Sequence, residues 1–187
     1  MTTAPASAPA AFPETRGREK GYDKRAVDEF LARARTAFEA GGEPLTAGDV
    51  RRVAFPLVRR GYAIASVDAA LGRIEDAFAA REREAALSQG AAREWVGHTR
   101  EIAQAVLDRL SRPRGHRFDR VSSLRYGYRI DEVDLVSDKI SGYLETGRSV
   151  SVEQVRSVAF RMQRGGYREA QVDAVLDAVV EVMLAVA

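Results

Sequence analysis

The sequence predicts an all-α protein, a tandem repeat of helix-turn-helix units arranged in two halves that a helical linker joins. Two observations predict this fold class. The pattern GYxxxxVD occurs four times in the 187 residues, and such self-similarity indicates one small unit that has been copied. After the copies, apolar residues recur at intervals of three and four, the spacing of a helix face that packs in a bundle or coiled coil. In the first copy these residues are Val27, Leu31, Ala34 and Phe38.

The repeated motif is expected to have a structural role. Glycine adopts positive φ without steric cost and often ends a helix, so we expect each motif glycine to form the corner between two helices. The tyrosine would then cover the start of the next helix, the valine would enter the core, and the aspartate would complement the helix dipole. The motif residues are Gly21, Tyr22, Val27 and Asp28; Gly61, Tyr62, Val67 and Asp68; Gly127, Tyr128, Val133 and Asp134; and Gly166, Tyr167, Val172 and Asp173.

The four copies are of two alternating types. An aromatic residue lies nine positions before the glycine in the first and third copies, at Phe12 and Phe118. In the second and fourth copies it lies six positions before the glycine, at Phe55 and Phe160. The longer segments that precede these two copies also align with each other without a gap. The chain is therefore predicted to consist of two tandem halves, each with two related units.

This alternation defines the predicted domains. Residues 1–11 are rich in Ala, Pro and Ser without the pattern of a signal peptide, which indicates a disordered leader. The first repeat pair spans residues 12–80. Thr46 in this pair and Ser151 in the second half are predicted N-caps of helices that precede the second motif of each half. Pro56 is expected to shorten the first of these helices.

The second half is predicted to repeat the first after a helical linker. The linker spans residues 81–117, with a break near Gly90 and a hinge at residues 112–116, where Pro and Gly occur together. The second repeat pair spans residues 118–187. Arg161 stands where the first half has Pro56, so the helix here is expected to run further than its counterpart.

Composition argues against several functions. The chain has no cysteine, and its two histidines, His98 and His116, lie at no metal-ligand spacing, so we expect no metal. It has no nucleotide-binding, serine-hydrolase or metalloprotease motif, which argues against an enzyme, a cofactor or a small-molecule substrate. A net charge of +2 argues against a dedicated nucleic-acid binder. Without a long apolar run, the chain is expected to be cytoplasmic.

One cluster of basic residues is a candidate for contact with an anionic surface. Arg51, Arg52, Arg59 and Arg60 form the densest such cluster in the sequence. Several basic residues together attract an anionic lipid surface weakly and reversibly. The alternative, which we favour on charge balance, is a solvated arginine face without a partner.

The residues around the second motif resemble a known family. LTxxDVxxxxFxxxxRGYxxxxVDxxL, which begins at Leu45 and ends at Leu71, is similar to the N-terminal domain of the DivIVA family of bacterial cell-division and cell-pole scaffolds. With four copies from Phe12 onward, the chain resembles the DivIVA-domain repeat proteins of actinobacteria. The resemblance implies a non-enzymatic scaffold connected with cell division or polar growth, located at the septum or pole. It also implies binding to other proteins and dimerisation.

The chain departs from the family in two respects. The family places an aromatic residue followed by a basic one on the membrane, in crossed loops before the GY, and continues into a long coiled coil. Here the only aromatic residue among the pairs before the four glycines is Tyr126, and no long heptad array follows any copy. Membrane insertion is therefore an expectation of the family that these residues do not support. Weak contact of the arginines with an anionic membrane, or with nucleic acid, is the alternative function.

Overall fold

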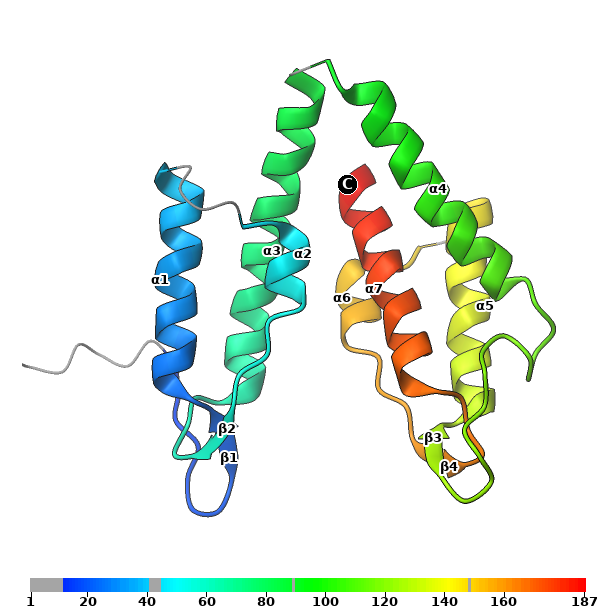
Figure 1. The fold of residues 1–187 in the computed structure, drawn as a ribbon, viewed down its shortest axis with the longest axis horizontal. Coiled ribbons are helices and arrows are strands. Elements are labelled where there is room, and N and C mark those ends of the chain that lie inside the picture. The colour runs from blue at the N-terminus through cyan, green and yellow to red at the C-terminus, as the bar shows by residue number, and fades with distance from the viewer. Residues whose placement is uncertain (1–11, 41–44, 89, 148) are drawn as a thin grey trace, which may run out of the picture. The chain divides into compact units, whose positions relative to one another are not determined.

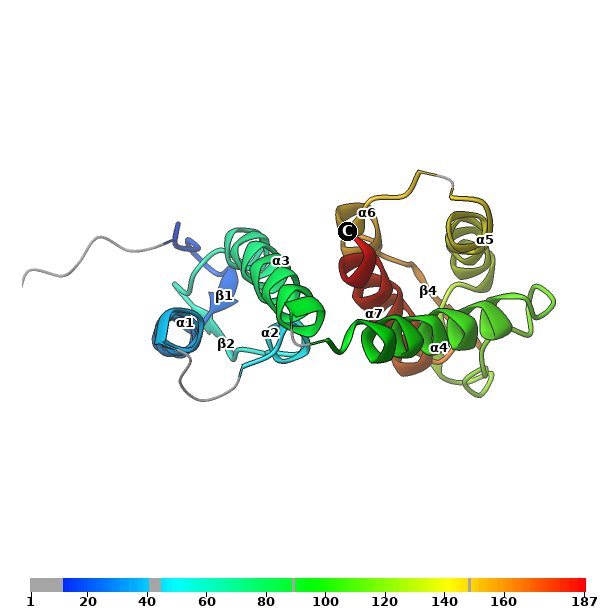
Figure 2. The same cartoon turned by 90° about the horizontal axis from the view of Figure 1, so that it is seen from above.

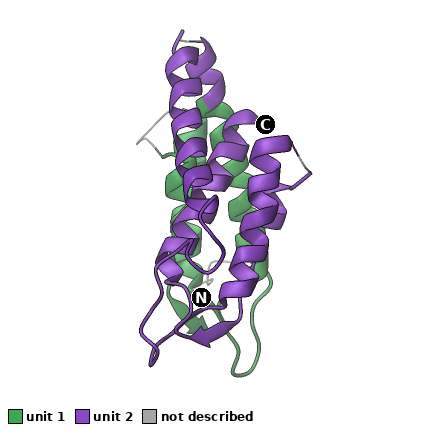
Figure 3. Cartoon of the chain, turned by 90° about the vertical axis from the view of Figure 1, so that its right-hand side faces the viewer, with its two compact units in different colours: residues 1–82 green, residues 83–187 purple. Residues whose placement is uncertain are grey.

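The computed structural model describes residues 12–40, 45–88, 90–147 and 149–187. The predicted leader, residues 1–11, lies outside the described residues. The described part of the chain is mostly helical, with 62% helix and two small two-stranded sheets, in agreement with the all-α prediction. The chain divides into two compact units, residues 1–82 and residues 83–187 (Figure 3).

Unit 1 consists of two long helices that follow two short paired strands. In chain order its elements are β1 (Lys20–Tyr22), α1 (Lys24–Ala40), α2 (Ala47–Arg51), β2 (Leu57–Arg59) and α3 (Ile64–Ser88), of which α3 continues past the end of the unit. β1 and β2 are antiparallel, and both α1 and α3 lead away from them in the same direction (Figure 1).

The core of unit 1 lies where these helices begin. Val27, Tyr62 and Val67 form a buried cluster. The side chains that pack around it are Phe12, Tyr22, Leu31, Phe55 and Leu71. At the far end of the same seam the rings of Phe38 and Phe78 make an edge contact, with centroids 5.3 Å apart. Burial of these valine and aromatic side chains contributes to the hydrophobic stabilisation of the unit.

The two short helices begin where the sequence predicts. Thr46 caps α2 and Ser151 caps α6 (Val152–Arg156), and each side chain forms a complete capping box with the residue three positions later. The prediction that Arg161 extends the second helix was wrong. Both helices have the same length, because the chain turns away after each and runs extended into a strand. Pro56 therefore lies outside α2 and does not decide where it ends.

Unit 2 has the same order of elements as unit 1, preceded by one more long helix. Its elements are the end of α3, then α4 (Ala92–Leu110), β3 (Tyr126–Tyr128), α5 (Ile130–Thr146), α6, β4 (Met162–Arg164) and α7 (Glu169–Val186). β3 and β4 are antiparallel. α4 packs along α7 and α5 (Figures 1 and 2). With α6 on it as well, α7 buries a run of apolar residues that includes Val179, Val180 and Val182 to Leu184.

The region predicted as a linker is part of this packing. The predicted break is confirmed, since α3 ends at Ser88, Gly90 has φ +75°, and α4 begins at Ala92. The predicted hinge at residues 112–116 was wrong. This segment follows α4 and is hydrogen-bonded to α5, as described below, so it is an anchored strap within unit 2.

Candidate functional site

The four GY motifs meet in pairs, one pair in each unit. In unit 1 the Tyr22 amide donates to the Tyr62 carbonyl over 3.0 Å, and the Tyr62 amide donates to the Tyr22 carbonyl over 2.9 Å. In unit 2 Tyr128 and Tyr167 exchange the same two bonds, each of 2.9 Å. The two motifs of a unit therefore cross backbone to backbone and make the same contacts in both directions.

This crossing explains the glycines. A Cβ atom on Gly21 would lie 2.2 Å from the Tyr62 carbonyl oxygen, and one on Gly61 would lie 2.4 Å from the Tyr22 carbonyl oxygen. In unit 2 the corresponding distances are 2.3 Å at Gly127 and 2.4 Å at Gly166. No side chain fits at such distances from a backbone atom. Glycine is required because two backbones approach closely.

The predicted reason for the glycines was therefore wrong. None of the four has positive φ, and none ends a helix. In the second motif of each half, the positive φ falls one residue earlier, at Arg60 and Gly165. The motif is a strand crossing followed by a helix and not a helix-turn-helix corner. The short pairing of the strands gave too weak a periodic signal to be recognised in the sequence.

Aromatic contacts across the crossing are reciprocal as well. The Phe12 ring packs edge-on against Tyr62, and Phe55 does the same against Tyr22, with centroids 5.2 and 5.4 Å apart. In unit 2 Phe118 packs on Tyr167 at 5.3 Å, and Phe160 packs on Tyr128 at 5.1 Å. The two alternating spacings of phenylalanine thus place each ring on the tyrosine of the other motif. Such pairs add about 0.5–1.5 kcal/mol each beyond the area they bury.

The aspartates of the motif bind the tyrosines of the partner motif. The Tyr62 hydroxyl donates to Asp28 over 3.3 Å, and the Tyr167 hydroxyl donates to Asp134 over 3.0 Å. Tyr22 is hydrogen-bonded to Asp68 in the same way. The aspartates thus act across the crossing, in addition to lying near the starts of their helices as the sequence predicted.

These contacts shift the acidity of the tyrosines. Burial, together with the Asp173 carboxylate to which it is hydrogen-bonded, raises the pKa of Tyr128 to about 12. Burial also raises the pKa of Tyr167 to about 12, and the bond to Asp134 adds to this effect. Burial and the Asp68 carboxylate raise the pKa of Tyr22. Tyr22, Tyr128 and Tyr167 are therefore held as neutral hydrogen-bond donors.

The valines of the motif complete the core beneath the crossing. Val27, Val67, Val133 and Val172 are all almost wholly buried, as the periodicity predicts. Each lies on the helix that follows its own motif. All sixteen predicted motif residues thus gather in two places, one crossing in each unit.

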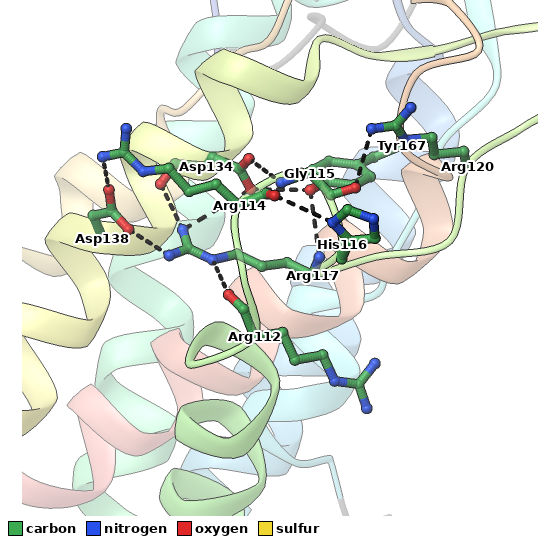
Figure 4. Close-up of polar contacts among 9 residues, drawn as sticks. All are labelled: Arg112, Arg114, Gly115, His116, Arg117, Arg120, Asp134, Asp138 and Tyr167. Carbon is green, nitrogen blue, oxygen red and sulfur yellow. Dashed lines mark hydrogen bonds and ion pairs between the residues drawn. The ribbon is translucent and has the colours of Figure 1, made fainter.

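In unit 2 the crossing is joined to a buried ionic network (Figure 4). Asp134 accepts hydrogen bonds from the Tyr167 hydroxyl and, over 2.7 Å, from the Gly115 amide. The Arg117 guanidinium lies 3.9 Å from the Asp134 carboxylate and donates to the Asp134 carbonyl over 2.7 Å. Both Arg117 and Arg114 bind Asp138, one turn further along α5. The strap after α4 is thus fixed to the crossing by charge-assisted bonds.

Sequence reasoning missed this network. The side chains of Arg117 and Asp134 are only 8% and 6% exposed, and burial of such groups requires pairing. Burial opposes ionisation of Asp138, but the bonds from Arg117 and Arg114 outweigh it, so the pKa of Asp138 lies below its usual range. Two features of the sequence could have indicated it. Asp134 and Asp138 lie four residues apart and therefore on one face of a helix, and the segment that contains Arg114 and Arg117 carries the opposite charge.

The predicted arginine patch is not one surface. Arg51 is buried in an ion pair with Glu75, and Arg52 pairs with Asp49. Arg59 and Arg60 are exposed at the end of β2, beside the crossing, several residues further along an extended segment. The four residues therefore divide into two ion-paired arginines at α2 and two exposed arginines at the strand end.

The strand ends of both units carry exposed side chains. In unit 1 Lys20 lies opposite Arg59 in the β1–β2 register, and Arg60 follows with φ +56°. In unit 2 Leu124 and Tyr126 are 83% and 56% exposed just before the crossing, with the Arg164 guanidinium 5.7 Å from the centre of the Tyr126 ring. We refer to these two groups as the basic tip of unit 1 and the apolar tip of unit 2.

Comparisons with known proteins give no assignment. No family model matches the sequence, and no curated protein or solved structure does so either. Among the described residues, no group of three or more His, Asp or Glu side chains is placed to hold a metal ion. None of the described helices is both long enough and apolar enough to cross a membrane.

Proposed function

We propose that this chain is a non-enzymatic interaction protein of the DivIVA type, with two halves copied from one ancestral repeat pair, and that it scaffolds other proteins during cell division or polar growth. What supports the proposal is the reciprocity of the contacts at each crossing. When each of two segments makes with the other the contact that the other makes with it, the two are related as the halves of a two-fold dimer are.

The resemblance implies a parallel dimer of two chains, and each unit here holds two such segments in one chain. In unit 1 the segments are β1 with α1 and β2 with α3, and both helices run the same way from the strands (Figure 1). We infer that the repeat pair replaces dimerisation of separate chains. Two such units in one chain would offer a partner two linked sites, which raises the overall affinity without any new contact.

Localisation in the native cell tests the proposal. A fluorescent fusion of the full chain, expressed at its native level, is expected at the division septum or the cell pole. A matched fusion that carries Gly61→Val and Gly166→Val, which break both crossings, should be diffuse. Uniform fluorescence of the unmutated fusion throughout the cell cycle would contradict the proposal.

A second candidate function, contact with an anionic membrane surface, is favoured by the two tips. Like charges directly opposite each other on neighbouring strands destabilise a sheet, so Lys20 and Arg59 are costly unless an anion lies between them. Exposed Leu124 and Tyr126 beside Arg125 and Arg164 would add apolar contact at a lipid interface. Each basic residue near such a surface contributes about 1 kcal/mol.

Co-sedimentation with vesicles tests this second candidate. We expect the full chain to sediment with anionic vesicles at low salt, and to be released at high salt as the charges are screened. Replacing both Leu124 and Tyr126 by Ser should weaken binding, whereas Leu87→Ser, at another exposed site, should not. Absence of binding at low salt would eliminate this candidate, and preferential binding to DNA would assign the tips to nucleic acid.

A further inference from the structure

Unit 2 contains an open apolar pocket among α4, α5 and α7. Its volume is about 420 Å³, within the range of about 300–1,000 Å³ typical of small-molecule sites. The side chains that line it and matter here are Trp95, Val96, Tyr143, Leu144, Val182 and Val186. Val96 and Val186 are 52% and 63% exposed, so the pocket presents apolar surface to solvent. An apolar ligand would remove this surface from water.

In unit 1, whose described residues include no counterpart of α4, aromatic side chains fill the space between the far ends of α1 and α3. There the Phe38 and Phe78 rings are in contact, and the Arg81 guanidinium lies over Phe38, 5.4 Å from its centre. Counted from the motif valines, Leu144 and Val186 stand in unit 2 at the positions of Phe38 and Arg81. Leu144 and Val186 are smaller than their counterparts and line the pocket, whereas Met183, at the position of Phe78, is buried in the core.

The lining of the pocket includes a basic residue, Arg100. Among the residues that the structure describes, the Arg100 side chain has no ion pair or hydrogen bond. The guanidinium fork matches a carboxylate, which it binds through two parallel hydrogen bonds. By contrast, the Trp95 indole N–H is already bound to the Ala185 carbonyl over 3.4 Å, so that side chain offers only its apolar surface.

The helix ends limit the charge of the ligand. Gly147, the C-cap of α5, and Val186, the last residue of α7, both line the pocket. The C-terminal end of a helix carries a partial negative charge that repels anions. These two helix ends disfavour any anion, so a negatively charged head group has to be held by the Arg100 guanidinium, and one with a single charge is repelled less than one with two, such as a phosphate monoester.

We propose that this pocket binds the aliphatic chain of a monocarboxylate, with the carboxylate on Arg100 and the chain against Trp95 and Leu144. The site is independent of the scaffold function proposed above, since it uses neither the crossings nor the tips. A medium-length chain is chosen to match the volume of the pocket, about 420 Å³.

The single tryptophan of the chain reports directly on this site. The full chain is titrated with decanoate and with dodecanoate, below their micelle concentrations, and the Trp95 emission is followed. We expect a saturable change with a stoichiometry of one. Arg100→Gln should weaken dodecanoate binding about tenfold, the loss of one charge-assisted contact, and leave the binding of dodecanol unchanged.

Filling the pocket is the second arm of the experiment. Leu144→Phe reproduces the side chain of unit 1 and should weaken dodecanoate binding at least about tenfold. Ala103→Leu, which also narrows the pocket, serves if the first variant unfolds, and Leu87→Phe on an exposed surface is the matched control. An emission change that never saturates, or equal binding by the filled variants and the control, would overturn the site. Dodecyl phosphate or dodecanol binding more tightly than dodecanoate would overturn the assignment of the carboxylate.

Discussion

At the residue scale, the motif glycines are set by contact between two backbones. The Tyr22 carbonyl oxygen would lie 2.4 Å from a Cβ on Gly61, and a backbone atom cannot move aside as a flexible side chain can. Gly61→Ala should therefore lower the free energy of unfolding by about 1–3 kcal/mol, the cost of overpacking. Thermal unfolding followed by circular dichroism measures this loss.

Gly97→Ala is the matched control for that substitution. Gly97 lies inside α4, and a Cβ there would meet no atom within 4 Å. Alanine in a helix interior is more favourable than glycine by about 0.5–1 kcal/mol, so this variant should be slightly more stable. Two substitutions of the same kind with opposite signs would establish the crossing, and an unchanged Gly61→Ala variant would refute it.

The crossing tyrosines make stability depend on pH at the alkaline end. The pKa values of Tyr128 and Tyr167 in the folded protein, about 12, exceed the value of about 10 for an unfolded tyrosine. The folded state thus binds more protons above pH ~10, so the stability that these groups contribute is complete below ~10 and is lost as pH rises to ~12. A spectrophotometric titration of tyrosinate should show two groups that ionise late.

Replacing one of these tyrosines shows how much of the stability lost at high pH is due to its own ionisation and how much to other groups. Tyr167→Phe should cost about 1 kcal/mol at neutral pH through the lost bond to Asp134, and should reduce the alkaline loss of stability. Unfolding midpoints at pH 8 and above 10 measure both effects. If the variant loses stability with pH as steeply as the unmutated chain does, the ionisation of Tyr167 is not the cause.

At the scale of elements, the helices were predictable and the strands were not. The seam of Val27, Leu31, Ala34 and Phe38 has a helical period over many residues, so the helix was recognised. Each strand is three residues long, too short for an alternating pattern to be detected. The glycine signal was read as a helix end because helix caps are the commoner use of glycine. Its partner on the other strand, over thirty residues away, is not marked in the local sequence.

The attachment of the strap after α4 to α5 depends mainly on Arg117, the residue that follows it. Arg117 and Arg114 both bind Asp138, but their side chains are 8% and 68% exposed. Arg117→Met leaves Asp134 buried without its cation and should cost about 3 kcal/mol. Arg114→Met removes a solvent-screened pair and should cost about 1 kcal/mol or less. Urea unfolding of both variants measures the difference, and equal losses would contradict the buried network.

At the scale of the whole molecule, the contacts that form each crossing lie within a single unit. The backbone bonds between Tyr22 and Tyr62 lie in unit 1, and those between Tyr128 and Tyr167 lie in unit 2. The phenylalanines that cover the tyrosines belong to the same unit in each case. Damage to one crossing should therefore be local, and unfolding of the chain need not be a single transition.

Trp95, which lies in unit 2, makes this testable in the intact chain. Gly61→Ala breaks the crossing of unit 1 only, so part of the helical signal should melt earlier while the Trp95 emission keeps its midpoint. Gly166→Ala, the matched variant in unit 2, should move the Trp95 midpoint downward, because a Cβ there would lie 2.4 Å from the Tyr128 carbonyl oxygen. If both variants shift both signals equally, the two units unfold as one, and coupling through the continuous helix α3 outweighs the separation of their cores.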